Sequence, residues 1–553
     1  MLFPTVFGCS VSTVAFIYIL PTTEAKLYAS PSQLPGGKTY DFIVIGASPN
    51  TPLDWNYTTI PQAFLHNRTM AYPRGKLLGG STSINYMTST RGSADDFDRF
   101  ASVTGDPGWS WKALEPYMKK VERLAPPQDD HSTFGEVDPL IHGTSGPLTI
   151  TLTGYPLTID QRIIQTTEQL AEFPYNVDMN SGNTIGFGWT QSTIGNGARV
   201  SSVDAYIQPK LDASIPNLDV VINAQVTRLL HSGTVEGLPS FRGVEFASSP
   251  KSKRFTLTAA KEVILSAGAI NTPQILLLSG IGPPSALSAH SIKTIVELPG
   301  VGQNLPDHPL VANHTFAELS LEEWETSKQE PFVGGPAAQI GWFRLPTNSS
   351  VFAAHGDPSA GPKSAHFEFL PFDGFVSTTG PPPSSGHYFT IITAAVSPAS
   401  PVLINPRPGG TVSLASADPF AFPLIDPRFF SHAVDLHVMR EAIKAALRFV
   451  RAPAWRDYIV APFGALAVVQ TDAEIEEYAR ENGGSVFHPV GTAAMGRPSD
   501  ENAVVNPDLT VRGVRGLRVV DASVLPFIPA AHTQAAVYIV AERAADLVKA
   551  AHA

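Results

Sequence analysis

Cysteine is nearly absent from this chain of 553 residues, since Cys9 is the only one. A single cysteine cannot form an intramolecular disulfide, which excludes a disulfide-stabilised fold. Charged residues are also scarce at 16%, and the formal net charge is −11. No cluster of Lys and Arg interrupts this acidic balance, so we expect no nucleic-acid partner. With 43% hydrophobic residues, the composition is that of a globular chain long enough for two packed domains.

Long apolar runs are also missing, apart from one at the N-terminus. Residues 6–20 are uncharged and mostly apolar, and a small-residue stretch ending at Ala25 follows them. The run is too short and too early for a membrane span, and it is typical of a signal peptide over residues 1–25. We therefore expect a secreted protein with no membrane attachment in its mature form. The N-glycosylation sequons at Asn56, Asn67, Asn313 and Asn348 fit secretion.

The glycine motif of a dinucleotide-binding fold is incomplete. Residues 40–46 form an apolar, β-branched run that predicts a buried parallel strand. Such a strand normally leads into G-x-G-x-x-G and a helix whose N-terminus holds a pyrophosphate. Here only the first glycine, Gly46, is present, and Pro49 and Pro52 forbid a regular helix. No second strand with an acidic end follows about 20 residues later.

Other glycine-rich segments are intact. Gly79 and Gly80 precede a row of small hydroxyl residues that begins at Ser81. Such a loop lets backbone N–H groups approach an anion or a flat ring, although a plain glycine-rich turn has the same composition. Residues 261–268 predict a strand and residues 272–282 a helix. This order suits a phosphate- or adenosine-binding edge, or ordinary β–α packing.

Two histidines near the C-terminus stand beside rigid or small residues. His488 precedes Pro489, and His532 opens a helix-like run over residues 533–548. Histidines held by a stiff backbone suit general acid–base chemistry near neutral pH. On the pattern alone, an ordinary loop or helix-cap histidine is the more frequent explanation for each, since most histidines in a chain are not catalytic. Amphipathic patterns predict further helices over residues 109–122 and 435–450, and strands over residues 148–152, 218–230 and 241–246.

The motifs together resemble the glucose–methanol–choline (GMC) oxidoreductases, most of all the fungal aryl-alcohol oxidases. The resemblance implies an α/β fold with a Rossmann-like FAD-binding domain, whose N-terminal βαβ unit is incomplete here. The resemblance also implies that an α+β substrate domain, built on an antiparallel sheet, is inserted into the FAD-binding domain. Residues 38–310 would form the first FAD-binding part, residues 311–480 mainly the substrate domain, and residues 481–553 the return. The resemblance rests on residues 72–87, 261–282, 487–492, 505–509, 516–523 and 531–534.

The same resemblance implies roles for individual residues. His488 would accept the proton of a substrate hydroxyl, and His532 would hydrogen-bond the same oxygen. Tyr86 and Phe487 would lie near the substrate, and no metal site is implied. FAD would be bound near Gly46, Gly79, Gly80, Ser81, Asn85, Val226, Asp521, Ala522 and Thr533.

The reaction implied is oxidation of a primary, aromatic alcohol to the aldehyde. Hydride would pass to the flavin, with oxygen or a quinone as the final acceptor, in a monomeric enzyme. Two alternatives stay open. The family's helix and second strand after Ala47 are missing, so the chain is also compatible with an inactive, flavin-free secreted glycoprotein or a truncated gene product. The second alternative is a flavin-dependent hydroxynitrile lyase. The absence of G-x-S-x-G argues against a hydrolase.

Overall fold

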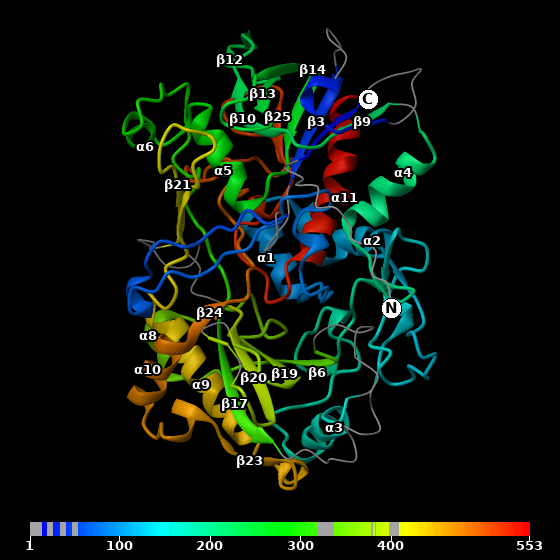
Figure 1. The fold of residues 1–553 in the computed structure, drawn as a ribbon, viewed down its shortest axis with the longest axis vertical. Coiled ribbons are helices and arrows are strands. Elements are labelled where there is room, and N and C mark those ends of the chain that lie inside the picture. Colours follow the sequence, from blue (N-terminus) through cyan, green and yellow to red (C-terminus); the bar gives the residue numbers. More distant parts are fainter. Residues whose placement is uncertain are drawn as a thin grey trace.

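The computed structural model describes residues 14–18, 26–33, 40–46, 53–155, 157–215, 217–317, 337–377, 380–381, 383–397 and 409–553. Two lobes are stacked along the long axis of the molecule, each built around one large sheet (Figure 1). The upper sheet is mixed, and the lower sheet is antiparallel. The predicted α/β fold with an inserted antiparallel sheet is therefore confirmed.

The upper sheet is organised around three parallel strands. Strand β3 (Tyr40–Gly46) has the predicted bounds and runs parallel to β14 (Phe255–Leu265), which is parallel to β25 (Leu517–Val519). Because parallel strands end at the same edge of a sheet, the residues after these three strands meet there. The other strands are β1 (Val14–Tyr18), β2 (Lys26–Tyr28), β9 (Leu218–Val221), β10 (Gln225–Leu230) and β13 (Gly243–Ala247).

Two predicted elements differ in their bounds. The single strand expected over residues 218–230 is divided into β9 and β10, because Asn223 between them adopts a left-handed conformation with φ 56°. The strand expected to reach Gly268 ends at Leu265, and Gly268 already begins helix α5 (Gly268–Leu278). The helix therefore starts four residues earlier than its apolar run suggested, at the small residues of the turn.

Strand β1 lies between β3 and β9 and is antiparallel to both. A complete βαβ unit would place its second parallel strand beside β3. In this sheet an antiparallel strand from the N-terminal segment stands there instead. Residues 14–18 fall within the predicted signal peptide, whose other residues lie outside the described ranges, as do residues 47–52 after Gly46.

Helices cover the upper sheet and continue into the middle of the molecule. Helix α1 (Ala94–Thr104) starts with a capping box in which Ser93 and Asp96 satisfy each other's backbone N–H groups. Helix α11 (Gln534–Ala551) packs on α2 (Trp111–Val121), so the C-terminus closes the lobe begun near the N-terminus. The remaining helices here are α4 (Gln208–Asp212), α5 and α6 (Pro284–Ser288).

The lower sheet is covered by helices on one face, and its other face packs with residues of the loops before His488 and His532. Helix α9 (Ala433–Phe449) packs on the helical face, against β17, β19 and β20. The strands are β6 (Gly186–Trp189), β17 (Pro309–Ala317), β18 (Gln339–Phe343), β19 (Phe367–Asp373), β20 (Tyr388–Ala395), β23 (Ile459–Pro462) and β24 (Gly483–Ser485). The other helices are α3 (Asp160–Gln169), α8 (Ser350–His355) and α10 (Asp472–Asn482).

The opposite face of the lower sheet is mainly apolar. Its side chains pack together with Val486 and Ala530, which come from the loops carrying the two predicted catalytic histidines. This surface, hereafter the apolar face, includes Leu310, Ala312, Ile340, Trp342, Leu370, Ile392 and Ala394. Within the described ranges, no helix combines the length and apolar character that crossing a membrane requires.

Candidate active site

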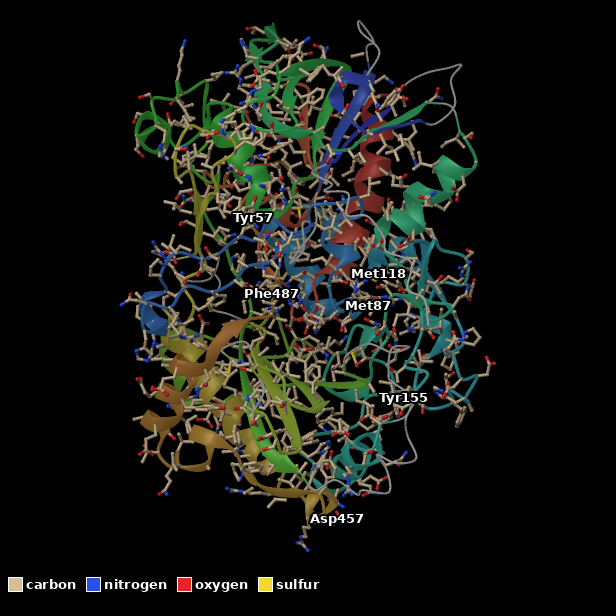
Figure 2. All side chains as sticks on the ribbon, viewed as in Figure 1. Tyr57, Met87, Met118, Tyr155, Asp457 and Phe487 are labelled. Carbon is tan, nitrogen blue, oxygen red and sulfur yellow. The ribbon has the colours of Figure 1, made fainter. Side chains whose placement is uncertain are left out.

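The two predicted catalytic histidines meet between the lobes. His488 follows strand β24, and His532 lies two residues before helix α11. Their ring centroids are 4.8 Å apart, and the ring planes are inclined at 77°. Phe487, directly before His488, is labelled in the middle of the molecule in Figure 2. Residues separated by 44 positions in the sequence therefore lie in contact with each other.

A third histidine contacts His488. The Nδ1 atoms of His308 and His488 are 3.2 Å apart, so one of them must carry the shared hydrogen. Burial lowers the pKa of His308 to about 3, and it also lowers the pKa of His488 well below its usual value, assisted by His532, His308 and Arg74. Both rings are thus neutral near pH 7. If Nδ1 of His488 donates to His308, its Nε2 carries a free lone pair and can act as a base.

Glu368 on strand β19 holds the second catalytic histidine. Its Oε1 lies 2.8 Å from Nε2 of His532, and its side chain is fully buried. The backbone N–H of His532 donates to Oγ1 of Thr90 at 2.8 Å. Sequence reasoning missed Glu368, although a carboxylate in an otherwise apolar, buried strand needs a partner and is a usable signal.

The segment that carries Thr90 is fixed by a buried charge cluster, hereafter the charge quartet: Arg91, Glu122, His142 and Asp178. Arg91 pairs with Glu122, and the two ring nitrogens of His142 lie 2.7 Å from Glu122 and 2.9 Å from Asp178. Both ring nitrogens face carboxylates, so both must carry hydrogen and the imidazole is charged. Two cations then balance two anions beneath the segment that supports His532.

The loop of His488 is held by a second buried carboxylate, Asp307. It accepts the backbone N–H groups of His308 and His488, and the hydroxyls of Tyr72 and Ser485. Just before His488, Phe487 adopts a left-handed conformation with φ 64°, which is uncommon for a bulky residue. Sequence reasoning missed the role of Asp307, because its partners lie far away in the chain.

Most of the predicted cofactor residues lie at one edge of the upper sheet and along the glycine-rich loop. Gly46 ends β3, and the Asp521–Ala522 turn follows β25 at the same edge. Gly268 begins α5 with φ 79°, and a Cβ atom there would meet nothing within 4 Å. Open space at the N-terminus of an 11-residue helix suits an anionic or flat ligand.

The glycine-rich loop is tied to the start of α11. Gly79 and Gly80 have φ values of 88° and 52°, which explains the glycines. Ser81 accepts the backbone N–H of Gly75, and Asn85 donates to Gln534 at 2.8 Å. The loop and the segment after His532 are therefore neighbours. Met87, close after Asn85, lies at the same level between the lobes as Phe487 in Figure 2.

The remaining predicted residues occupy different environments. Both carboxylate oxygens of Asp521 are engaged, with Gly268, Thr272 and Ser523, so the side chain holds the turn together rather than facing a ligand. The carbonyl of Ala522 accepts the N–H of Gly491 in the His488 loop, and Thr533 stands at the N-cap position of α11, where its side chain makes no capping hydrogen bond. Val226 is buried in β10, whereas Tyr86 is 65% exposed.

Comparison with known proteins identifies the family. The N-terminal GMC oxidoreductase model matches residues 8–310, and the C-terminal GMC oxidoreductase model matches residues 406–541. This chain belongs to the GMC oxidoreductases. The family binds FAD, so the predicted cofactor is confirmed. The GMC chain is thus an FAD-dependent oxidoreductase, and the residues at the strand edge and the glycine-rich loop would hold the cofactor.

Similar proteins cover nearly the whole GMC chain. Pyranose dehydrogenase 3 of Leucoagaricus meleagris is 36% identical over 541 residues, covering 95% of this chain and 88% of its own. A formate oxidase from Aspergillus oryzae has a TM-score of 0.78 and 28% identity, covering 91% of this chain and 89% of its own. A fungal aryl-alcohol oxidase shares the fold with a TM-score of 0.75 and 24% identity, covering 95% and 93%.

One relative also bears on the incomplete glycine motif. Pyranose dehydrogenase of Agaricus campestris is 34% identical over 605 aligned positions, covering 98% of this chain and 99% of its own. Because this chain has only 553 residues, the relative carries positions that the chain lacks. The helix and second strand that the family resemblance implies after Ala47 would be among such positions.

Proposed function

We propose that this GMC oxidoreductase oxidises a primary, aromatic alcohol to the aldehyde. FAD, when bound, supplies a two-electron acceptor for hydride. Nε2 of His488 would accept the hydroxyl proton, and the bound FAD would take up the hydride released when the carbinol C–H bond breaks, which would leave a carbonyl. The observation that carries the proposal is the convergence of the half-buried His488 and the buried His532, whose ring centroids are 4.8 Å apart, with a carboxylate holding His532.

The two histidines are suited to different tasks. His488 is neutral because burial lowers its pKa, so it can accept a proton across the physiological range. His532 is fixed by Glu368 through its side chain and by Thr90 through its backbone, so it can hold the substrate oxygen in place. Holding the substrate and the base together lowers the barrier by proximity. The base alone typically raises the reaction rate by about 10²–10⁴-fold.

The apolar face supports an aromatic substrate. The side chains along β18, β19 and β20 near the histidines are mostly apolar, and Trp342 lies 6.0 Å from His532 in an edge-to-face arrangement. A ring carrying one hydroxymethyl group would place its apolar body against this face and its oxygen between the histidines. A pyranose, with a hydroxyl on most ring carbons, would leave several of them without partners there.

A pyranose is nevertheless the second candidate substrate. It is supported by the pyranose dehydrogenases among the relatives. Within the described residues, Nε1 of Trp342 and Oε2 of Glu368 are buried without a hydrogen-bond partner. These two atoms could bind sugar hydroxyls. Oxygen or a quinone would reoxidise the flavin in either case, and we further propose that the protein is secreted and monomeric.

The test is steady-state oxidation of benzyl-type alcohols and of glucose by the purified, flavin-loaded protein, with oxygen and a benzoquinone as acceptors. We expect aldehyde from the benzyl-type alcohols, and loss of at least about 100-fold in turnover for His488→Ala. His66→Ala, at a half-exposed histidine paired with Glu477, is the matched control. Unchanged turnover in His488→Ala would falsify the assignment, and faster turnover of glucose would favour the second candidate.

The same preparation tests the two alternatives. An absence of flavin absorption bands after incubation with FAD would support the flavin-free glycoprotein. Release of a carbonyl compound from a cyanohydrin, with no consumption of oxygen or quinone, would support the lyase.

A further inference from the structure

The two carboxylate oxygens of Asp307 accept hydrogen bonds from two different kinds of donor. Its Oδ1 accepts two backbone N–H groups, those of His308 and His488, each at 2.8 Å. Its Oδ2 accepts two hydroxyls, from Tyr72 at 2.6 Å and Ser485 at 2.5 Å. The residue is only 4% exposed, so these four donors satisfy the carboxylate. A hydroxyl can rotate and accept instead, whereas a backbone N–H can only donate.

One oxygen atom therefore fixes the backbone of two neighbouring histidines. His308 and His488 come from segments 180 residues apart in the sequence, and their side chains meet again at the two Nδ1 atoms. Backbone and side chains together close a ring of contacts through Asp307. That ring sets the 3.2 Å separation of the Nδ1 atoms, on which the tautomer of His488 depends.

The loop of His488 needs this support because its own backbone is strained. Phe487 has φ 64°, which a bulky side chain rarely adopts unless the surroundings hold it. Its N–H donates to Oγ of Ser485 at 2.7 Å, and its carbonyl accepts from Nη2 of Arg74 at 2.6 Å. Ser485 also donates to Asp307, so the strained residue is connected to the same carboxylate.

We propose that Asp307 is a positioning residue that sets the orientation of His488 by accepting two backbone hydrogen bonds through one oxygen, and not through its negative charge. The inference rests on the proposed role of His488 as the base. It places no contact between Asp307 and the substrate.

Three variants separate position from charge. Asp307→Asn is uncharged but keeps an oxygen at the Oδ1 site, and its amide can donate to the hydroxyls of Tyr72 and Ser485. Asp307→Glu keeps the charge but moves the acceptor by one methylene group. Asp307→Leu has a similar shape and no acceptor, so it leaves two backbone N–H groups unpaired. A charge-based role would rank Glu above Asn, whereas a positional role ranks Asn above Glu.

We expect Asp307→Asn to retain kcat within about 3-fold and Asp307→Glu to lose about 100-fold, the usual effect of moving a reacting group by about 1 Å. KM and flavin content should stay near those of the wild type. With a carbinol deuterated at the reacting carbon, the isotope effect on kcat should rise in Asp307→Glu, because the chemical step becomes slower. A purely structural role would change the thermal midpoint and leave this isotope effect unaltered.

Crystal structures of the Asn and Glu variants give a readout independent of turnover. The Nδ1–Nδ1 separation of His308 and His488 should stay near 3.2 Å in Asp307→Asn and lengthen in Asp307→Glu. Asp307→Leu should resemble the Glu variant; if it does not fold, the order of Asn and Glu still decides. Equal kcat values in these two variants, or an unchanged separation in Asp307→Glu, overturn the proposal. A wild type that oxidises no alcohol overturns the proposed function instead, while the crystallographic comparison still tests the positioning role.

Discussion

Replacing His142 with leucine should destabilise the protein by about 3–5 kcal/mol, the usual cost of removing one partner from a buried ion pair. The imidazole is fully buried and bridges Glu122 and Asp178, and together with Arg91 it leaves the charge quartet neutral. In His142→Leu, Arg91 alone faces Glu122, and Asp178 loses its charged partner. Such a loss is large because a buried carboxylate without a cation remains desolvated and uncompensated.

The size of the chain determines how this cost appears in a melting experiment. Unfolding entropy is about 2.1 cal/mol/K per residue, or about 1.2 kcal/mol/K for the whole chain. A loss of about 4 kcal/mol then lowers the thermal midpoint by about 3 °C if the chain melts as one unit, and about twice that if the lobes melt separately. The matched control is His66→Leu, whose exposed pair with Glu477 should contribute at most about 1 kcal/mol.

The difference in folding stability between the wild type and His142→Leu should depend on pH, because the shifted pKa values of the charge quartet contribute to stability only over part of the pH range. Burial alone would lower the pKa of His142, but its hydrogen bonds to Asp178 and Glu122 raise it overall. That contribution is complete below the unfolded value of about 6.5 and is lost as pH rises through the raised value. Burial would raise the pKa values of Glu122 and Asp178, but the bonds to His142 lower both. Their contribution is present above about pH 4.5 and is lost as pH falls.

The assay is therefore differential scanning fluorimetry of both His variants and the wild type from acid to alkaline pH. The thermal midpoint of the wild type should exceed that of His142→Leu most between about pH 4.5 and 6.5, and the two midpoints should converge at lower and at higher pH. A midpoint difference no larger than that of His66→Leu, or one that grows steadily towards alkaline pH, would refute the charged bridge.

Three further outcomes are expected. Because burial lowers the pKa of His488, kcat/KM should stay constant as pH falls through about 6.5 and decline only at more acid pH; a decline that begins above 6.5 would contradict this reasoning. Glu368→Gln keeps the shape of the side chain but weakens its bond to His532, so kcat should fall about 10- to 100-fold in steady-state assays, and a change under 2-fold would argue against the contact. In a secreting host, peptide mass spectrometry should find glycans at the three exposed sequon residues Asn56, Asn67 and Asn348. No glycan is expected at Asn313, because it is buried and its amide donates to the carbonyls of Val311 and Ile391.

Local patterns predicted much of the fold, because they report burial. The apolar run over residues 40–46 is strand β3 with the same bounds, and the helical periodicity over residues 435–450 and 533–548 corresponds to α9 and α11. Breaks caused by a single backbone conformation were not predictable in this way. Asn223 divides one expected strand into two, and neither its residue type nor the apolar pattern around it requires that.

Contacts between distant residues account for what the sequence did not predict at the site. The two histidines were found because their local motifs are distinctive. Glu368 and Asp307 contact them across 164 and 181 residues, respectively, and no periodicity reports such pairs. The place of β1 beside β3 was equally unforeseen, because an apolar N-terminal run suits both a leader and a strand.

The pairing of β25 with β14 has a consequence for how the protein is made. Strand β14 leaves the ribosome about 250 residues before its parallel neighbour, and at roughly 5–20 residues per second the delay is on the order of 10–50 s. During this time the lower-lobe strands can pair, while the upper sheet lacks an edge strand, helix α11 and His532. The nascent chain therefore exposes an unfinished apolar core until β25 and α11 are synthesised. Binding of chaperones to that intermediate, and sensitivity to loss of β25 or α11, follow from the order in which this lobe is assembled.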